Sequence, residues 1–90
     1  MTATPTKFPD GERTFTPLHG APEPWTVTGG GNVLTVGADT LLWDDEERAY
    51  VLDEGTRWRC IRVYVQGQVA LDATLTDPPE GSHARVGTWT

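Results

Sequence analysis

Two β-rich runs joined by a two-residue turn constrain the fold of this chain more than any other feature. Residues 57–65 and 68–76 are rich in aliphatic, aromatic and β-branched side chains, and Gln66-Gly67 separates them. A two-residue loop that ends in glycine is typical of a tight antiparallel hairpin. The register that this turn sets pairs Tyr64 with Val69, Arg62 with Leu71, Cys60 with Ala73, and Trp58 with Leu75.

Side chains alternate between the two faces of such a hairpin. The face that we expect to point into the core carries Trp58, Cys60, Tyr64, Val69, Leu71, Ala73 and Leu75, with Arg62 as its one charged exception. The opposite face carries Arg57 and Arg59 far from the turn, and Ile61, Val63, Val65 and Ala70 near it. Because the turn half is apolar on both faces, it fits a central sheet position, a second packed layer or a partner's surface.

Further short strands are predicted on both sides of this hairpin. Residues 32–36 and 39–43 form a second hairpin around Gly37-Ala38, with Leu34 facing Leu41 and Val33 facing Leu42. Residues 48–52 return after an acidic turn, which sets Ala49 near Leu42 and Tyr50 near Leu41. Residues 25–28 and 84–89 read as strands, and residues 76–81 as a loop. No segment has an apolar stripe at helical spacing, so the expected fold is all-β: a small β-barrel or β-sandwich of about six to eight short strands.

The first 24 residues differ in composition from the rest. They contain five of the seven prolines, at positions 5, 9, 17, 22 and 24. Proline lacks the backbone N–H that a central strand or a helix needs. Residues 1–24 are therefore predicted to be an extended, Pro-rich N-terminal arm, and residues 25–90 a compact β domain. Phe8 and Phe15 on this arm either pack on their own domain or dock on a neighbouring subunit.

Length and charge limit the function classes. Ninety residues form one small domain, and a net charge of −6 disfavours direct binding of nucleic acid. The single cysteine excludes an internal disulfide and suits a reducing compartment. Residues 1–7 lack the apolar stretch of a signal peptide, and no run approaches the ~20 apolar residues of a membrane span. We expect a cytoplasmic or virion protein without membrane contact.

Groups that carry chemistry are sparse. His19 and His83 have no second ligand at zinc spacing, and residues 44–47 lack the pattern of a calcium loop. Gly29-Gly30-Gly31 lacks the Lys-Ser/Thr end of a phosphate loop. Cys60 lies on the predicted core face, where thiols are usually inert. No nucleophile, base and orienting group can be assembled, so we expect no enzyme, no cofactor and no metal.

Charged and aromatic residues are the candidate contact sites. The acidic turn at residues 44–47 and the arginines at 57 and 59 are either solvated or complementary between copies packed head to tail. Tryptophan is either core or an anchor for partners and sugars, and Trp25 and Trp89 lie at segment ends. The expected interface comprises Phe8, Phe15, Trp25, Asp44, Asp45, Glu46, Glu47, Arg57, Arg59, Ile61, Val63, Val65 and Trp89.

An arm with the sequence Thr4-Pro5-Thr6-Lys7-Phe8-Pro9 precedes a β domain rich in Thr, Gly and Pro. The hairpin from Thr40-Leu41-Leu42-Trp43 to Arg48-Ala49-Tyr50-Val51-Leu52 belongs to the same style. In these features the chain resembles small accessory structural proteins of tailed bacteriophages, especially head-decoration or cement proteins. The resemblance implies a non-enzymatic virion component that binds a capsid shell and neighbouring copies of itself, and thus a homo-oligomer once assembled.

Two other functions remain open at this point. An acidic chain can imitate nucleic acid and inhibit a DNA- or RNA-binding enzyme, although the acidic residues here are too clustered to follow a phosphate ladder. A small carbohydrate-binding module could use tryptophan to stack on sugars.

Overall fold

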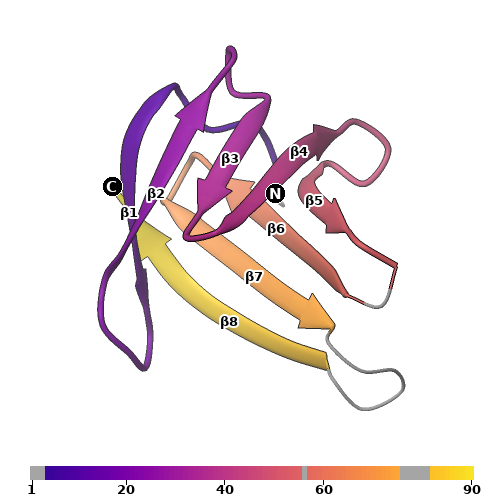
Figure 1. Cartoon of the computed structure of the whole chain (residues 1–90). Helices are drawn as coiled ribbons and strands as arrows, with labels where there is room; N and C mark the ends of the chain where they lie inside the picture. Colours follow the sequence, from indigo (N-terminus) through magenta and orange to yellow (C-terminus); the bar gives the residue numbers. More distant parts are fainter. Residues whose placement is uncertain (1–3, 56, 76–81) are drawn as a thin grey trace.

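The computed structural model is a closed barrel of eight antiparallel strands, and it describes residues 4–55, 57–75 and 82–90 (Figure 1). Each strand pairs with the next one in sequence, and the last strand pairs with the first. The predicted all-β fold is confirmed, in its barrel form. The strands are β1 (Gly11–Pro17), β2 (Glu23–Thr28), β3 (Val33–Val36), β4 (Asp39–Asp44), β5 (Ala49–Asp53), β6 (Trp58–Tyr64), β7 (Val69–Leu75) and β8 (Ser82–Trp89). The loop predicted at residues 76–81 lies outside the described residues.

The registers of the two predicted hairpins are confirmed. Leu34 faces Leu41 in β3–β4, and Cys60 faces Ala73 in β6–β7. Gly37 and Gly67 adopt positive φ angles of 59° and 81° at the two turns, a conformation that glycine adopts without steric cost.

The predicted register of β4–β5 is wrong by two residues. Trp43 faces Tyr50, and Leu42 faces Val51. The Asp44 carboxylate accepts hydrogen bonds from the N–H groups of Glu46 (2.8 Å) and Glu47 (3.0 Å), which tightens the turn and keeps Asp44 inside the ladder. A slip of two residues leaves every side chain on its predicted side of the strand.

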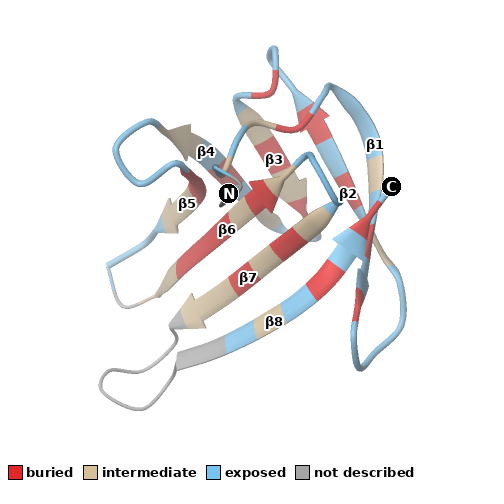
Figure 2. Cartoon of the chain, turned by 180° about the vertical axis from the view of Figure 1, so that it is seen from behind, coloured by how far each residue is buried: buried red, intermediate tan, exposed pale blue. Residues whose placement is uncertain are grey.

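Buried residues alternate with exposed or partly exposed ones along most strands (Figure 2), so one face of each strand lines the barrel interior. Phe15 and Trp25 stack at 4.5 Å between ring centroids near its middle. The apolar core comprises Phe8, Phe15, Trp25, Val27, Leu34, Val36, Leu41, Tyr50, Ile61, Val63, Ala70 and Trp89.

The β6–β7 hairpin presents to the core the face that we expected to lie outside. Ile61, Val63 and Ala70 are fully buried in the core, so the predicted orientation is wrong. Trp58, Tyr64, Val69, Leu71 and Ala73 lie at the outward positions and are only partly buried, whereas Cys60 is covered although its position is outward. Both faces are apolar near the turn, so hydrophobicity alone could not decide between them.

The N-terminal part differs from the expected arm. Residues 11–17 form β1, and residues 23–24 begin β2, so the barrel includes most of the segment predicted to extend from it. Proline is tolerated because Pro24 precedes the first β2–β3 pair, Trp25 with Val36, and no partner requires its missing N–H. Phe8 and Phe15 lie in the core of the same chain. Residues 1–3 lie outside the described residues.

The seam between β1 and β8 closes the barrel around a glycine. Three registered pairs join the strands, and Thr14 and Thr90 exchange two backbone hydrogen bonds of 3.0 and 3.1 Å. A Cβ atom on Gly87 would collide with the Thr16 carbonyl oxygen and lie 2.7 Å from the Phe15 ring. The seam therefore requires glycine at position 87.

We predict that Gly87→Ala lowers the free energy of unfolding by about 1–3 kcal/mol, the usual cost of overpacking a filled site. Urea unfolding followed by tryptophan fluorescence measures this loss. Thr88→Ala, at an exposed neighbouring position, is the matched control and should change stability by less than about 0.5 kcal/mol. Equal stabilities of Gly87→Ala and the wild type would contradict this account of the seam.

Candidate functional site

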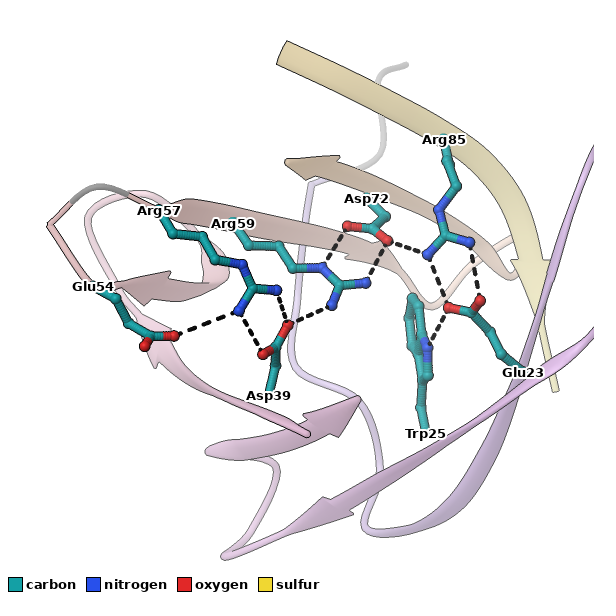
Figure 3. Close-up of polar contacts among 8 residues, drawn as sticks. All are labelled: Glu23, Trp25, Asp39, Glu54, Arg57, Arg59, Asp72 and Arg85. Carbon is teal, nitrogen blue, oxygen red and sulfur yellow. Dashed lines mark hydrogen bonds and ion pairs between the residues drawn. The ribbon is translucent and has the colours of Figure 1, made fainter. Parts of the chain in front are cut away.

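One end of the barrel interior is ionic rather than apolar (Figure 3). Six charged side chains from five strands and from the residue before β6 meet there: Glu23, Asp39, Arg57, Arg59, Asp72 and Arg85. We call this set the ion network.

Asp72 is the centre of the ion network. It is only 1% exposed, and it accepts hydrogen bonds from Arg59 Nε (3.0 Å), from Arg59 Nη2 (2.7 Å) and from Arg85. Burial alone would raise the pKa of Asp72, but the bonds from Arg59 and Arg85 outweigh it and lower that pKa below its usual range. Asp72 is therefore a charged, structural carboxylate.

The flanking carboxylates are paired in the same way. Arg85 donates two hydrogen bonds of 2.9 Å to Glu23 and lowers its pKa, and Trp25 Nε1 adds a third at 3.1 Å. Arg57 donates two hydrogen bonds to Asp39 and lowers its pKa, and Arg59 Nη1 adds another at 2.9 Å. Three arginines balance three carboxylates, so the network leaves no net charge to attract a ligand.

The arginines that were expected to contact the acidic turn of another copy are already paired within their own chain. Arg57 and Arg59 are bound to Asp39 and Asp72 of the same chain. The acidic turn has its own neighbour, since Glu47 lies 3.4 Å from Arg62. Asp45, Glu46 and Glu47 remain exposed on the β4–β5 turn.

The other predicted interface residues divide by location. Val65 is 38% exposed in the β6–β7 turn. Six of the other predicted interface residues are buried inside the barrel, where a partner protein cannot contact them while the chain is folded: Phe8, Phe15, Trp25, Ile61, Val63 and Trp89. Trp25 and Trp89 are thus not available to stack on a sugar.

The outer surface of the barrel carries apolar residues. Those on β6 and β7 were expected from the sequence to face the core. The strand registers place six apolar residues in one lateral row across β3 to β8: Val33, Leu42, Val51, Cys60, Ala73 and Ala84. A second group, Leu71, Val86 and Leu18, lies beside this row, and Leu18 N–H donates to the Val86 carbonyl at 3.0 Å. Because the row runs around six of the eight strands of a closed barrel, only its β7–β8 end lies on the same side as the second group. We call this side the outer apolar face; it comprises Leu18, Leu71, Ala73, Ala84 and Val86.

Exposure and charge distinguish the outer apolar face from the rest of the surface. Leu18 is 70% exposed and Val86 is 41% exposed. Of the outward positions of β6, β7 and β8 whose side chains the structure describes, Arg62 alone is charged, although the chain has 13 acidic residues. Beside Val86 is a hollow of about 330 Å³, lined by Pro17, Leu18, His19, Ala84, Arg85 and Val86.

Neither the ion network nor the outer apolar face shows a catalytic or metal-binding arrangement among the described residues. Burial raises the pKa of Cys60, which keeps the thiol protonated and unreactive. Within the described ranges, no three His, Cys, Asp or Glu side chains cluster as metal ligands. The same ranges contain no helix of the length and hydrophobicity that a membrane span requires.

Comparisons with known proteins add no relative. No protein-family model matches the chain, and neither the curated proteins nor the solved structures contain a match. The ion network and the outer apolar face are thus the features from which function can be argued.

We predict that Asp72→Asn lowers the free energy of unfolding by about 3 kcal/mol, because it leaves the buried Arg59 guanidinium and the partly exposed Arg85 guanidinium without their shared carboxylate. Chemical denaturation at neutral pH measures the loss. Glu54→Gln removes a 56% exposed partner of Arg57 and should cost less than about 1 kcal/mol. Similar losses in the two variants would contradict the structural role of Asp72.

The pH dependence of stability provides a second test of the ion network. The folded-state pKa values of Glu23, Asp39 and Asp72 lie below the ordinary values of 4.5, 3.8 and 3.8. In that range the unfolded chain binds more protons, so the stabilisation is complete above pH 4.5 and is lost as pH falls through these values toward the folded-state pKa values. Asp72→Asn should weaken this acid dependence, which unfolding curves between pH 2 and 7 measure.

Proposed function

We propose that this protein is a non-enzymatic assembly module that associates with further copies of itself through the outer apolar face. The observation that carries the proposal is an apolar surface on the outside of an acidic barrel, with no acidic side chain at the described outward positions of β6, β7 and β8. Apolar patches of this kind, rimmed by polar residues, mark protein contact sites. A barrel also has no open strand edge to extend, so copies cannot join by adding strands to one sheet, and this contact is made face against face.

A second copy fits this surface by shape and by charge. Leu18 projects beside a hollow that it helps to line, so a two-fold related copy offers the same projection and the same hollow in return. Arg62 is the one cation at the described outward positions of β6–β8, and Glu47 beside it is 55% exposed. Two copies packed face to face can therefore match each arginine with an acidic turn of the partner.

The more specific form of this proposal is a capsid-decoration protein, located in the virion. Such a protein binds a shell and neighbouring copies and needs no active site. The resemblance in composition supports this form, and the outer apolar face provides a surface for the contact between copies.

We predict that the wild-type chain self-associates between micromolar and millimolar concentration, and that Val86→Glu weakens this association at least roughly tenfold, or ~1.4 kcal/mol. Sedimentation equilibrium measures both dissociation constants. Thr28→Glu, which adds the same charge at an exposed outward position of β2, should leave association unchanged. A wild type that remains monomeric, or equal effects of the two variants, would refute the outer apolar face as the contact.

Added salt separates this contact from one based on ion pairs. Each copy carries a net charge of −6, so salt screens the repulsion between copies and should strengthen an apolar contact. A contact dominated by ion pairs would weaken under the same conditions.

A further inference from the structure

Residues 4–10, the N-terminal segment, cross one end of the barrel without joining its strand ladder. Thr6 N–H donates to the Val63 carbonyl at 2.8 Å, so the segment starts beside β6 (Figure 1). Asp10 lies at the β2–β3 turn, where its carboxylate accepts hydrogen bonds from Gly30 (3.0 Å) and Gly31 (2.6 Å). The segment thus lies on the barrel as a bound peptide would.

Phe8 fixes the N-terminal segment to the barrel end. Its side chain is 2% exposed, and its ring centroid lies 4.7 Å from that of Trp89, 5.9 Å from Tyr50 and 6.0 Å from Trp25. We call these three rings the aromatic socket. Full burial of one phenylalanine side chain stabilises a contact by about 1.5–3 kcal/mol, so a single residue provides much of the affinity.

The aromatic socket also recognises the peptide backbone. The Tyr50 hydroxyl accepts a hydrogen bond from Phe8 N–H at 2.8 Å and donates one to the Gly31 carbonyl at 2.6 Å. Burial raises the pKa of Tyr50 to about 12, which keeps this hydroxyl protonated as a donor. A Cβ atom on Gly31 would lie 2.7 Å from the Phe8 carbonyl oxygen, so the turn leaves room for a passing chain.

The connection between the N-terminal segment and β1 allows the segment to leave as a unit. The β1–β2 ladder begins with Gly11 opposite Val27, directly after Asp10. Gly11 has a φ of 125°, which other residues rarely adopt, and therefore forms a natural pivot. Removing the segment from its site breaks no strand pair.

We propose that the aromatic socket is a peptide-binding site that takes the N-terminal segment of a second copy, so that copies exchange these segments. The socket fits the sequence Thr6-Lys7-Phe8-Pro9-Asp10, and another copy brings the same sequence. In dilute solution the segment of the same chain fills the socket, because its effective concentration is high. Assembly raises the local concentration of other copies. An exchanged segment then makes in a second copy the contacts that it makes in its own chain, so the copies are linked without any additional interface.

This exchange goes beyond the proposed function, because it does not involve the outer apolar face. The test uses full chains carrying Phe8→Ala or Phe8→Leu and a fluorescent peptide of residues 4–10. Fluorescence anisotropy should show micromolar binding to the Phe8→Ala chain and at least tenfold weaker binding of a peptide that carries Phe8→Ala. Binding should be weaker to the Phe8→Leu chain and weakest to the wild type, because their own segments compete for the socket. Phe8→Leu keeps an apolar side chain in the socket and so preserves the test if Phe8→Ala fails to fold.

Exchange between copies is then tested on the Val86→Glu background, where the outer apolar face is blocked. Concentrated Val86→Glu chain should still form a dimer in sedimentation experiments, and excess peptide should convert it to monomer. The Phe8→Ala/Val86→Glu double variant should stay monomeric. Absence of peptide binding to a folded Phe8 variant would refute the peptide site. A Val86→Glu chain that stays monomeric up to millimolar concentration would refute exchange and leave the proposed function standing.

Discussion

Closure of the sheet between β1 and β8 is the constraint on which the rest of this structure depends. Phe15 pairs with Trp89 across the seam, and both side chains point into the core. An eight-stranded barrel has an interior just wide enough to be filled by side chains. Once the seam is closed, every strand has one face committed to that narrow interior, and the other face must meet solvent or a partner. The apolar residues in excess of what the interior holds therefore appear outside.

The interior has two ends with opposite chemistry. Around Phe8, Trp25, Tyr50 and Trp89 it is aromatic, and the N-terminal segment completes it. At the other end, Asp72 and its arginines fill the same width with paired charges. A buried ion pair adds little net stability over a well-packed apolar pair, but it is costly to break. The ion network thus fixes which face of β6 and β7 points inward, because turning the hairpin over would separate Arg59 from Asp39.

Much of the fold could be predicted from the sequence, and the errors have physical causes. Turn residues and alternation were enough to predict an all-β fold and the registers of β3–β4 and β6–β7. The orientation of β6–β7 was not predictable from hydrophobicity, since Ile61 and Val63 oppose an equally apolar set. A signal was present in the charges: Arg59 and Asp72 lie diagonally on one face of the predicted hairpin, where opposite charges pair. The strand β1 was missed because the prolines were weighed without their positions: Pro17 is the last residue of β1, and Pro24 precedes the first β2–β3 pair.

The candidate site was less predictable than the fold for a related reason. Phe8 and Phe15 were recognised as anchors, yet a linear sequence does not say whether an anchor binds its own domain or another copy. For Phe8, whose segment lies outside the strand ladder, the sockets of its own chain and of a second copy are chemically identical. Under the proposed exchange, the protein concentration decides which of the two sockets Phe8 fills. This choice does not apply to Phe15, whose strand pairs on both sides with β2 and β8. A closed barrel that lacks strand edges has two ways to join its neighbours, by a face or by a segment outside the ladder, and we propose that this chain uses both.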